Sequence, residues 1–309
     1  LQYSDHYNIP MVFTYHTRYH DYAHYADPFP KERVGELITH WLGHFMSGCH
    51  RVVVPSESIK QMVSENYGLN DGVKVVPTGI DFDKFSSVNR EKARAERGWP
   101  EEETVFVSIG RLAKEKNFDL LIRSVAKLPQ DLSWRLVVLG EGDERENLET
   151  LADELGVASK VDLVGRVPAH KVPDYLAAAD IFAFASVTET QGLVTLEAMA
   201  TGLPVVAVKA SGTSDVVESG EQGILTEVDA DALAEGLRTV LESDDLQRKF
   251  SIKAQEKARL FTPDRQAGLM EEVYREAIDA NQQGKTLHPS LMSHWEAFLE
   301  FLGLPNAAS

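Results

Sequence analysis

The chain has 309 residues, of which 43% are apolar and 26% are charged, so a disordered acidic chain is excluded. A chain of this length suggests roughly two domains. The formal net charge of −17 is opposite in sign to that of a nucleic-acid-binding surface, so we expect no nucleic-acid partner. The single cysteine excludes an internal disulfide, and no run of about 18 apolar residues is present that would span a membrane.

Residues 1–80 predict a partial N-terminal domain of the α/β type. Short runs rich in Val, Ile and aromatic residues predict strands, and amphipathic stretches predict helices. The strands are expected in "MVFTYH", "RVVVP" and "KVVP", and the helices in "GELITHWLGHFMSG" and "SESIKQMVSENYG". The chain opens without Met, in what the pattern indicates is a helix, so we expect part of this domain to be missing. Pro, Gly and Asp together in "PTGIDFDKF" (77–85) predict an interdomain linker.

Residues 81–280 predict a doubly wound domain. Six short apolar runs alternate with amphipathic stretches, a pattern typical of a parallel sheet with helices on both faces. The strands are expected in "TVFVSIG", "WRLVVLG", "VDLVG", "IFAFAS", "PVVAVKA" and "GILT". Residues 281–309 then predict a loop (281–290) and an amphipathic helix (291–303) that can return to the N-terminal domain.

Polar residues follow these strands, where ligands bind in open α/β sheets. After the first strand, Arg111 and Lys116 predict a clamp for a diphosphate, although two solvated surface cations fit the spacing as well. After the second, "GEGDER" begins like a dinucleotide fingerprint but has Arg145 in place of the third glycine, so a dehydrogenase is disfavoured. Its position still permits close backbone approach to a ligand. After the third, the backbone at Arg166 and Val167 can face a nucleobase.

The stretch after the fourth strand, "SVTETQGLVTLEAMA", predicts the centre of the site. A helix is expected from Gly192 to Ala200, and the free backbone N–H groups at its start can bind phosphate oxygens. Those groups belong to Gln191, Gly192, Leu193 and Val194. Glu197 in the helix can accept ribose hydroxyls, and Glu189 in the loop can reach a sugar. The alternative is that Glu189 caps the helix and Glu197 lies on the surface.

Glu189 and Glu197 form an E-x7-E motif, and around it the chain resembles the retaining glycosyltransferases of the glycogen-synthase-like family. The resemblance also rests on "GRLAKEKN", "LVVLGEGDE", "VDLVGRVP" and "SGTSDVVESGEQGILT", and it covers about residues 10–280. It implies a GT-B fold, in which two Rossmann-like domains face a cleft, with an incomplete acceptor-side N-terminal domain here. "TETQGLV" and "TYHTRYHDYAHY" look most like bacterial diacylglycerol glucosyltransferases; sulfoquinovosyl- and mannosyl-lipid transferases look similar too.

The resemblance also implies roles for residues. Arg111 and Lys116 would neutralise the donor diphosphate, Glu197 would hold the ribose, and Glu189 would contact the donor sugar. The backbone of residues 191–194 would touch sugar and phosphate, and the backbone near Arg166 and Val167 would read the base. His16 would reach the reaction centre from the N-terminal domain. The diphosphate leaves and the configuration at the anomeric carbon is retained.

The same resemblance implies the substrates and the location. The donor would be a nucleotide sugar, UDP-linked, with no cofactor and no metal, and the acceptor would be a lipid at a membrane surface. We therefore expect a cytoplasmic enzyme of glycolipid biosynthesis, peripheral on the inner face of the membrane. Amphipathic "PFPKERVGELITHWLGHF", with Trp41, could contact that surface or simply pack in the core.

Three alternatives remain open. The acceptor could be a soluble sugar or polyol, or the chain could bind nucleotide without turnover, because the family's glycine-rich N-terminal loop is not found. A P-loop NTPase is disfavoured because its motif is absent.

Seven of the ten histidines lie in residues 1–50, and within the sets His16/His20/His24 and His40/His44 they recur every four residues, a spacing that could bind zinc. Tyr15, Tyr19, Tyr22 and Tyr25 could form an acceptor-side wall or an aromatic packing stripe. The sequence does not determine the oligomeric state.

Overall fold

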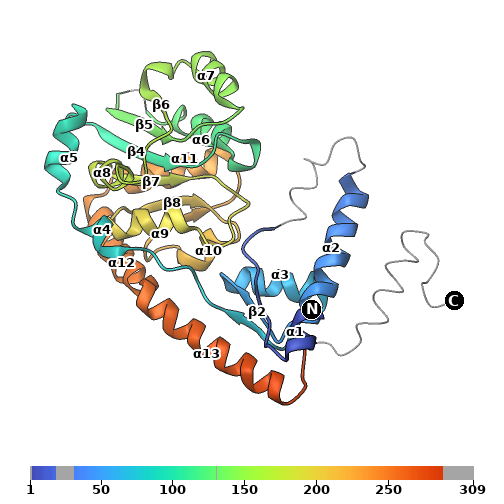
Figure 1. Cartoon of the computed structure of the whole chain (residues 1–309). Coiled ribbons are helices and arrows are strands. Elements are labelled where there is room, and N and C mark those ends of the chain that lie inside the picture. Colours follow the sequence, from blue (N-terminus) through green and yellow to red (C-terminus); the bar gives the residue numbers. More distant parts are fainter. Residues whose placement is uncertain (1, 19–30, 130, 288–309) are drawn as a thin grey trace. The chain divides into compact units, whose positions relative to one another are not determined.

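A computed structural model describes residues 2–18, 31–129 and 131–287 of the chain, and it divides into two compact units. Unit 1 combines Leu1–Pro77 with Gln266–Ser309, and unit 2 is Thr78–Arg265. Both contain parallel sheets with helical connections, so the predicted α/β class is confirmed (Figure 1). The helix predicted at 291–303 lies outside the described residues.

Unit 1 is built on a three-stranded parallel sheet in the order β1-β2-β3. The three predicted strands and both predicted helices are confirmed. Apolar faces of α2 and α3 pack on this sheet around Met46, Val52 and Ile59, all almost fully buried. The elements are α1 (Gln2–Tyr7), β1 (Val12–Thr14), α2 (Lys31–Ser47), β2 (Arg51–Val54), α3 (Glu57–Tyr67) and β3 (Val73–Val75).

The last helix of the described residues, α13 (Pro263–Gln282), contains the boundary between the units, and here the predicted boundary at residue 280 differs from the structure. From Gln266 onward it groups with unit 1, because its Val273 packs against that unit's strands. Glu276 accepts hydrogen bonds from Lys74 Nζ at 2.7 Å and Arg51 Nε at 2.9 Å. The hydrogen bond from Lys74 has the largest effect on the pKa of Glu276, and together with the bond from Arg51 it holds that pKa below its ordinary value.

Unit 2 contains a six-stranded parallel sheet in the order β6-β5-β4-β7-β8-β9. The chain runs outward through β4, β5 and β6, then returns to the other side of β4 and runs outward again. β4 and β7 are therefore neighbours at a switch point of the sheet. All six predicted strands are confirmed: β4 (Thr104–Ile109), β5 (Trp134–Leu139), β6 (Val161–Gly165), β7 (Ile181–Phe184), β8 (Val205–Val208) and β9 (Gly223–Thr226).

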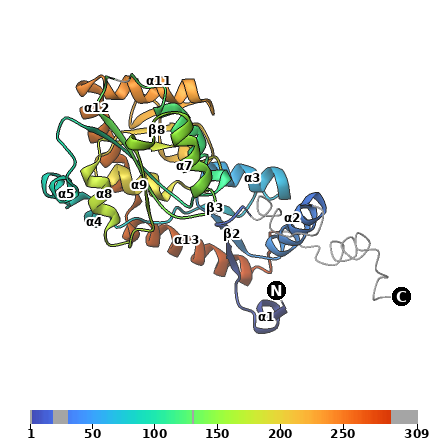
Figure 2. The same ribbon diagram turned by 90° about the horizontal axis from the view of Figure 1, so that it is seen from above.

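Helices cover both faces of this sheet, because successive strand residues point to opposite sides. Phe106, Leu136 and Val138 pack on one side, against α6, α7 and α11. Val105 and Val107 pack on the other, against α4, α8, α9 and α12, and Figure 2 shows α4, α8 and α9 beside one another. The helices are α4 (Phe82–Ser86), α5 (Arg90–Arg97), α6 (Phe118–Val125), α7 (Arg145–Glu154), α8 (Val172–Ala178), α9 (Leu193–Ala200), α10 (Thr213–Val216), α11 (Ala230–Leu241) and α12 (Asp244–Ala258).

The predicted linker at 77–85 is mostly ordered structure of unit 2, which corrects the sequence analysis. Asp81 accepts a hydrogen bond from Lys84 N at 3.2 Å and so caps α4. Phe82 and Phe85 are buried in the core on the α9 side of the sheet. Phe82 and Phe85 could have indicated this packing from the sequence, because phenylalanine side chains are usually buried. Only the residues immediately around the boundary at Pro77 and Thr78 connect the units at this crossing.

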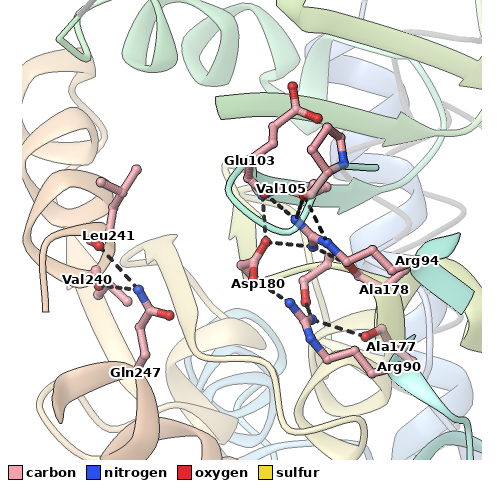
Figure 3. A network of polar contacts seen from close by, with 12 residues as sticks. Arg90, Arg94, Glu103, Val105, Ala177, Ala178, Asp180, Val240, Leu241 and Gln247 are labelled. Carbon is pink, nitrogen blue, oxygen red and sulfur yellow. Dashed lines mark hydrogen bonds and ion pairs between the residues drawn. The ribbon is translucent and has the colours of Figure 1, made fainter. Parts of the chain in front are cut away.

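A buried ion pair fastens α5, which the sequence analysis did not predict, to unit 2 (Figure 3). Arg94 is 3% exposed and donates to Asp180 Oδ2 at 3.1 Å and to the carbonyl of Ala178 at 2.8 Å. Asp180 also accepts from Val105 N at 2.8 Å and from Arg90 Nη2 at 2.6 Å. Helix α5 could not be predicted from an apolar stripe, because most of its residues are charged.

We expect Asp180→Ala to lower the free energy of unfolding by about 3–5 kcal/mol, because Arg94 is left buried without its counter-charge. Urea denaturation measures the loss. Asp153→Ala, at an exposed position of α7, is the matched control and should change stability little. Equal stabilities of the two variants would contradict the structural role of the pair.

Candidate active site

The loops after β4 and β7 meet at the switch point of the unit 2 sheet, and an ion pair joins them. Lys116 Nζ lies 2.5 Å from Glu189 Oε1, and the two side chains are 21% and 16% exposed. Ser186 Oγ donates to the same carboxylate oxygen at 2.8 Å. The structure therefore brings together Lys116 and Glu189, which the sequence analysis had placed in one site from different strands.

Arg111 lies in the same loop as Lys116 and is half exposed. Its Nη2 is 2.6 Å from Glu115 Oε1. Burial acts to raise the pKa of Glu115, but a backbone hydrogen bond and the Arg111 guanidinium outweigh it, so the pKa is lowered. Both cations predicted to form a diphosphate clamp thus have carboxylate partners. Lys116 is largely buried, whereas Arg111 is exposed, and their binding of a diphosphate stays a prediction.

Asn117 ties the two loops together and was missed by the sequence analysis. Its φ is +51°, in the left-handed region, which Asn tolerates better than most residues. Its Nδ2 donates to the carbonyl of Ala185 at 3.2 Å, at the end of β7. The signal was present in the sequence, since an Asn closing "GRLAKEKN" just before a helix is typical of such a turn.

The glycines of "GEGDER" approach the neighbouring loop rather than serving a dinucleotide. A Cβ on Gly140 would lie 1.8 Å from the carbonyl oxygen of Gly110, and one on Gly142 would lie 2.2 Å from that of Leu112. Arg145, which replaces the third glycine of the fingerprint, donates to the carbonyl of Leu163 at 2.9 Å. This loop–loop contact fixes the position of the Arg111 loop, and the expected close backbone approach to a ligand stays a prediction.

Helix α9 begins in this site without a side-chain cap. Gly192 is its N-cap residue, with φ at +74°, so the alternative that Glu189 caps the helix is wrong. The first N–H groups of a helix have no partner within it, and they carry the positive end of the helix dipole. These groups belong to residues 192–195, because Leu196 N makes the first helical bond, to the carbonyl of Gly192. The predicted set of Gln191, Gly192, Leu193 and Val194 overlaps them from Gly192 onward, and its binding of phosphate stays a prediction.

Glu197 stands in the second turn of α9 and is only partly exposed, so it is not a simple surface residue. Burial raises the pKa of its carboxyl, and the positive charge of Lys84 on α4 partly opposes this. Lys84 also donates to the carbonyl of Ala169 at 3.4 Å, in the loop that follows β6. A carboxylate held in such surroundings gains from a ligand that brings hydroxyl donors to it.

The loop after β8 packs against the backbone of Glu189, a contact that was not predicted from the sequence. Gly212 has φ at +76°, and a Cβ there would lie 2.6 Å from the carbonyl oxygen of Glu189. Ser211 Oγ donates to the same carbonyl at 3.2 Å. "SGTSD", noted only as part of a resemblance, supplied the Ser and Gly that this contact requires.

Comparison with known proteins agrees with this arrangement. Residues 89–257 match the family described as Glycosyl transferases group 1, and residues 2–84 match Glycosyltransferase Family 4. The chain belongs to the group 1 glycosyltransferase family.

Among curated relatives of this glycosyltransferase chain, an alpha-monoglucosyldiacylglycerol synthase of Streptococcus pneumoniae is 32% identical over 64% of this chain and 46% of its own length. A D-inositol 3-phosphate glycosyltransferase of Nocardioides sp. is 37% identical over 71% of this chain and 51% of its own. The chain thus spans about half the length of these relatives.

Solved structures show the same fold. Sucrose-phosphate synthase from Thermosynechococcus elongatus has a TM-score of 0.76 at 25% identity and covers 87% of this chain, which covers 68% of it. Anabaena HepE in complex with UDP and glucose has a TM-score of 0.74 at 23% identity, with coverages of 87% and 73%. These matches confirm the predicted GT-B fold class.

The remaining predicted site residues lie at other strand ends. Arg166 and Val167 follow β6 at the same edge of the sheet; Arg166 is exposed and Val167 packs partly into the core. His16 follows β1 in unit 1 and is exposed. Their parts in binding the base and in catalysis stay predictions.

The N-terminal histidines and tyrosines are only partly described. His20, His24, Tyr19, Tyr22 and Tyr25 lie outside the described residues. Tyr15 is fully buried in the unit 1 core, with its Oη 3.3 Å from that of Tyr67, which agrees with the packing alternative. Within residues 2–18, 31–129 and 131–287, no group of three or more His, Cys, Asp or Glu side chains could hold a metal ion. No helix in that part of the chain is long and apolar enough to cross a membrane.

We expect Glu197→Gln to raise the Tm at pH 7, because an isosteric neutral amide removes the burial cost of the ionised carboxyl. A folded-state pKa above the ordinary 4.5 means that this cost grows as pH rises through that raised pKa. The gain should therefore be largest near neutral pH, shrink as pH falls through the raised pKa and disappear only below pH 4.5, where the carboxyl is protonated in both the folded and the unfolded states. Thermal unfolding across this range checks it, with exposed Glu154→Gln as control; a gain independent of pH would contradict it.

Proposed function

We propose that this chain is the donor-binding part, with a portion of the acceptor-binding part, of a retaining glycosyltransferase of glycolipid biosynthesis. It would move a hexose from a UDP-linked donor to a lipid acceptor such as diacylglycerol. The observation that carries this proposal is the Lys116–Glu189 pair at the switch point, next to the uncapped start of α9. The pair brings one cation and one carboxylate to the sheet edge beside the first N–H groups of α9, and Glu197 lies in the second turn of that helix.

The nucleotide half of the donor would be held by charge and hydrogen bonds. Glu197 would accept the two ribose hydroxyls, and residues near Arg166 and Val167 would contact the base. Arg111, Lys116 and the first N–H groups of α9 would surround the diphosphate. Their positive charge is preorganised for the negative charge that grows on the departing diphosphate, so it stabilises the transition state more than the bound donor.

Glu189 would orient the sugar. Its carboxylate is fixed by Lys116 Nζ and Ser186 Oγ, and it can accept from hydroxyls of a hexose. The bond from the anomeric carbon to the diphosphate breaks, and a bond from that carbon to the acceptor oxygen forms on the same face. The acceptor's proton passes to the departing phosphate oxygen, so neither glutamate serves as a covalent nucleophile. His16 would contribute from the acceptor-side domain.

The lipid acceptor is supported by two relatives named alpha-monoglucosyldiacylglycerol synthase, from S. pneumoniae and Acholeplasma laidlawii. Trp41 on α2 is 55% exposed, which suits peripheral contact with a membrane at the cytoplasmic face. A soluble polyol phosphate is the second candidate, since a relative at 37% identity is named an inositol 3-phosphate glycosyltransferase. Uracil is the base we favour, because HepE shares the fold and its structures contain UDP.

Calorimetric titration with UDP, GDP and ADP tests the donor site. We expect UDP to bind, and Glu197→Ala to weaken that binding by about 10- to 100-fold, the value of a hydrogen bond to a charged group. Glu154→Ala is the control and should bind like the unchanged chain. Unchanged UDP affinity in Glu197→Ala would contradict the assignment of Glu197 to the ribose. Tighter binding of GDP or ADP than of UDP would replace uracil by guanine or adenine as the proposed base.

Glu189→Gln should instead abolish most transfer while the affinity for UDP changes little, because Glu189 is assigned to the sugar. Transfer from labelled UDP-glucose is measured with diacylglycerol vesicles and with inositol 3-phosphate. Product only on the vesicles supports the lipid acceptor, and product only on the soluble compound supports the second candidate. UDP binding without product on either would favour a nucleotide-binding chain without turnover.

A further inference from the structure

Gln191 uses both ends of its side-chain amide inside unit 2. Its Nε2 donates to the carbonyl of Thr78 at 2.8 Å, and its Oε1 accepts from Thr78 N at 2.7 Å. The side chain is 3% exposed. A buried amide satisfied on both sides by one backbone residue is held in one orientation. The proposed donor contact uses only the backbone of Gln191, so this side chain has no part in the function described so far.

Thr78 is the first residue of unit 2, directly after the crossing from unit 1. The next two residues, Gly79 and Ile80, contact residues 261–263, which lie just before the chain leaves unit 2 at Arg265. A Cβ on Gly79 would lie 2.7 Å from the Cα of Pro263, so only glycine permits this approach. Ile80 N donates to the carbonyl of Phe261 at 2.7 Å. We call Thr78, Gly79 and Ile80 the entry segment.

The loop that carries Gln191 is itself tightly determined. Two residues earlier, Glu189 is held by Lys116 and Ser186, and Gly212 lies against its backbone. One residue later, Gly192 begins α9 in a left-handed conformation. The peptide at Gln191 is therefore fixed on both sides, and a shift of the loop would have to move or break the two bonds to Thr78.

We propose that Gln191 is a positioning residue that couples the donor loop, residues 189–192, to the entry segment. A nucleotide that orders the donor loop then also slows opening of the entry segment. This inference rests on the proposed function, because it assumes that a nucleotide binds at the start of α9. Sugar transfer needs residues from both units, whereas nucleotide binding needs unit 2. Loss of the Gln191 side chain should therefore affect transfer more than nucleotide affinity.

Amide hydrogen exchange at Thr78 tests the coupling directly, since its N–H is the one bonded to Gln191. We expect Gln191→Met, of similar length but without hydrogen bonds, to speed this exchange about 5- to 10-fold, the worth of one hydrogen bond. Gln191→Glu, which keeps the acceptor but cannot donate, should show a smaller increase. Thr78→Ala keeps the backbone groups and serves as the control, with exchange like that of the unchanged chain. Val107 in β4 reports whether each variant remains folded.

Saturating UDP should slow Thr78 exchange in the unchanged chain and leave it unaltered in Gln191→Met. The same variant should bind UDP within about twofold of the unchanged chain, yet transfer at least tenfold more slowly. Equal Thr78 exchange in Gln191→Met and the unchanged chain would overturn the inference. So would exchange that ignores UDP although calorimetry shows that UDP binds. If calorimetry shows no nucleotide binding, the proposed function fails and this coupling fails with it. If Gln191→Met does not fold, the smaller increase expected for Gln191→Glu, which loses only the bond to the Thr78 carbonyl, becomes the test, and exchange equal to that of the unchanged chain then overturns the inference.

Discussion

The adjacency of β4 and β7 is the constraint on which the rest of unit 2 depends. The chain leaves this centre in both directions, so the loops after these two strands open toward each other with no intervening connection. Lys116 and Glu189 are 73 residues apart and meet only because of this strand order. The glycines at 140, 142 and 212 then let neighbouring loops approach closely enough to fix that pair. Local sequence supplies the residues, and topology makes them a site.

Much of this could be predicted from the sequence. Strands stood out because each is a short run of Val, Ile and Phe between turns, and their carboxyl ends located Arg111, Lys116, Glu189 and Glu197. What escaped prediction depends on contacts distant in sequence. Charged α5 is held by Arg94 and Asp180, which no periodicity reveals. Helix α13 groups with unit 1 from Gln266 onward, because Val273 packs against apolar side chains of that unit. Those partners are distant in sequence, so this grouping could not be predicted from the order of the elements along the chain.

Glu197 shows a conflict between stability and binding. Its carboxyl is partly buried beside a single opposing charge, that of Lys84, and burial is the stronger effect on its pKa. Such an arrangement is costly in the empty protein and is useful only when a ligand supplies hydroxyl donors. Lys84 limits this cost without a close ion pair to Glu197, so under the proposed function a ribose would have no such pair to displace. Strain of this kind is expected at a site selected for binding rather than for stability.

Unit 2 is one uninterrupted segment, whereas unit 1 is assembled from both ends of the chain. The two ends of that segment lie side by side, with Gly79 against Pro263. A domain whose ends adjoin can be inserted into, or exchanged within, a host without stretching the host's own chain. Under the proposed function, donor preference would therefore be a transferable property: replacing residues 78–265 by the matching segment of a relative would change the sugar nucleotide while leaving acceptor recognition in place.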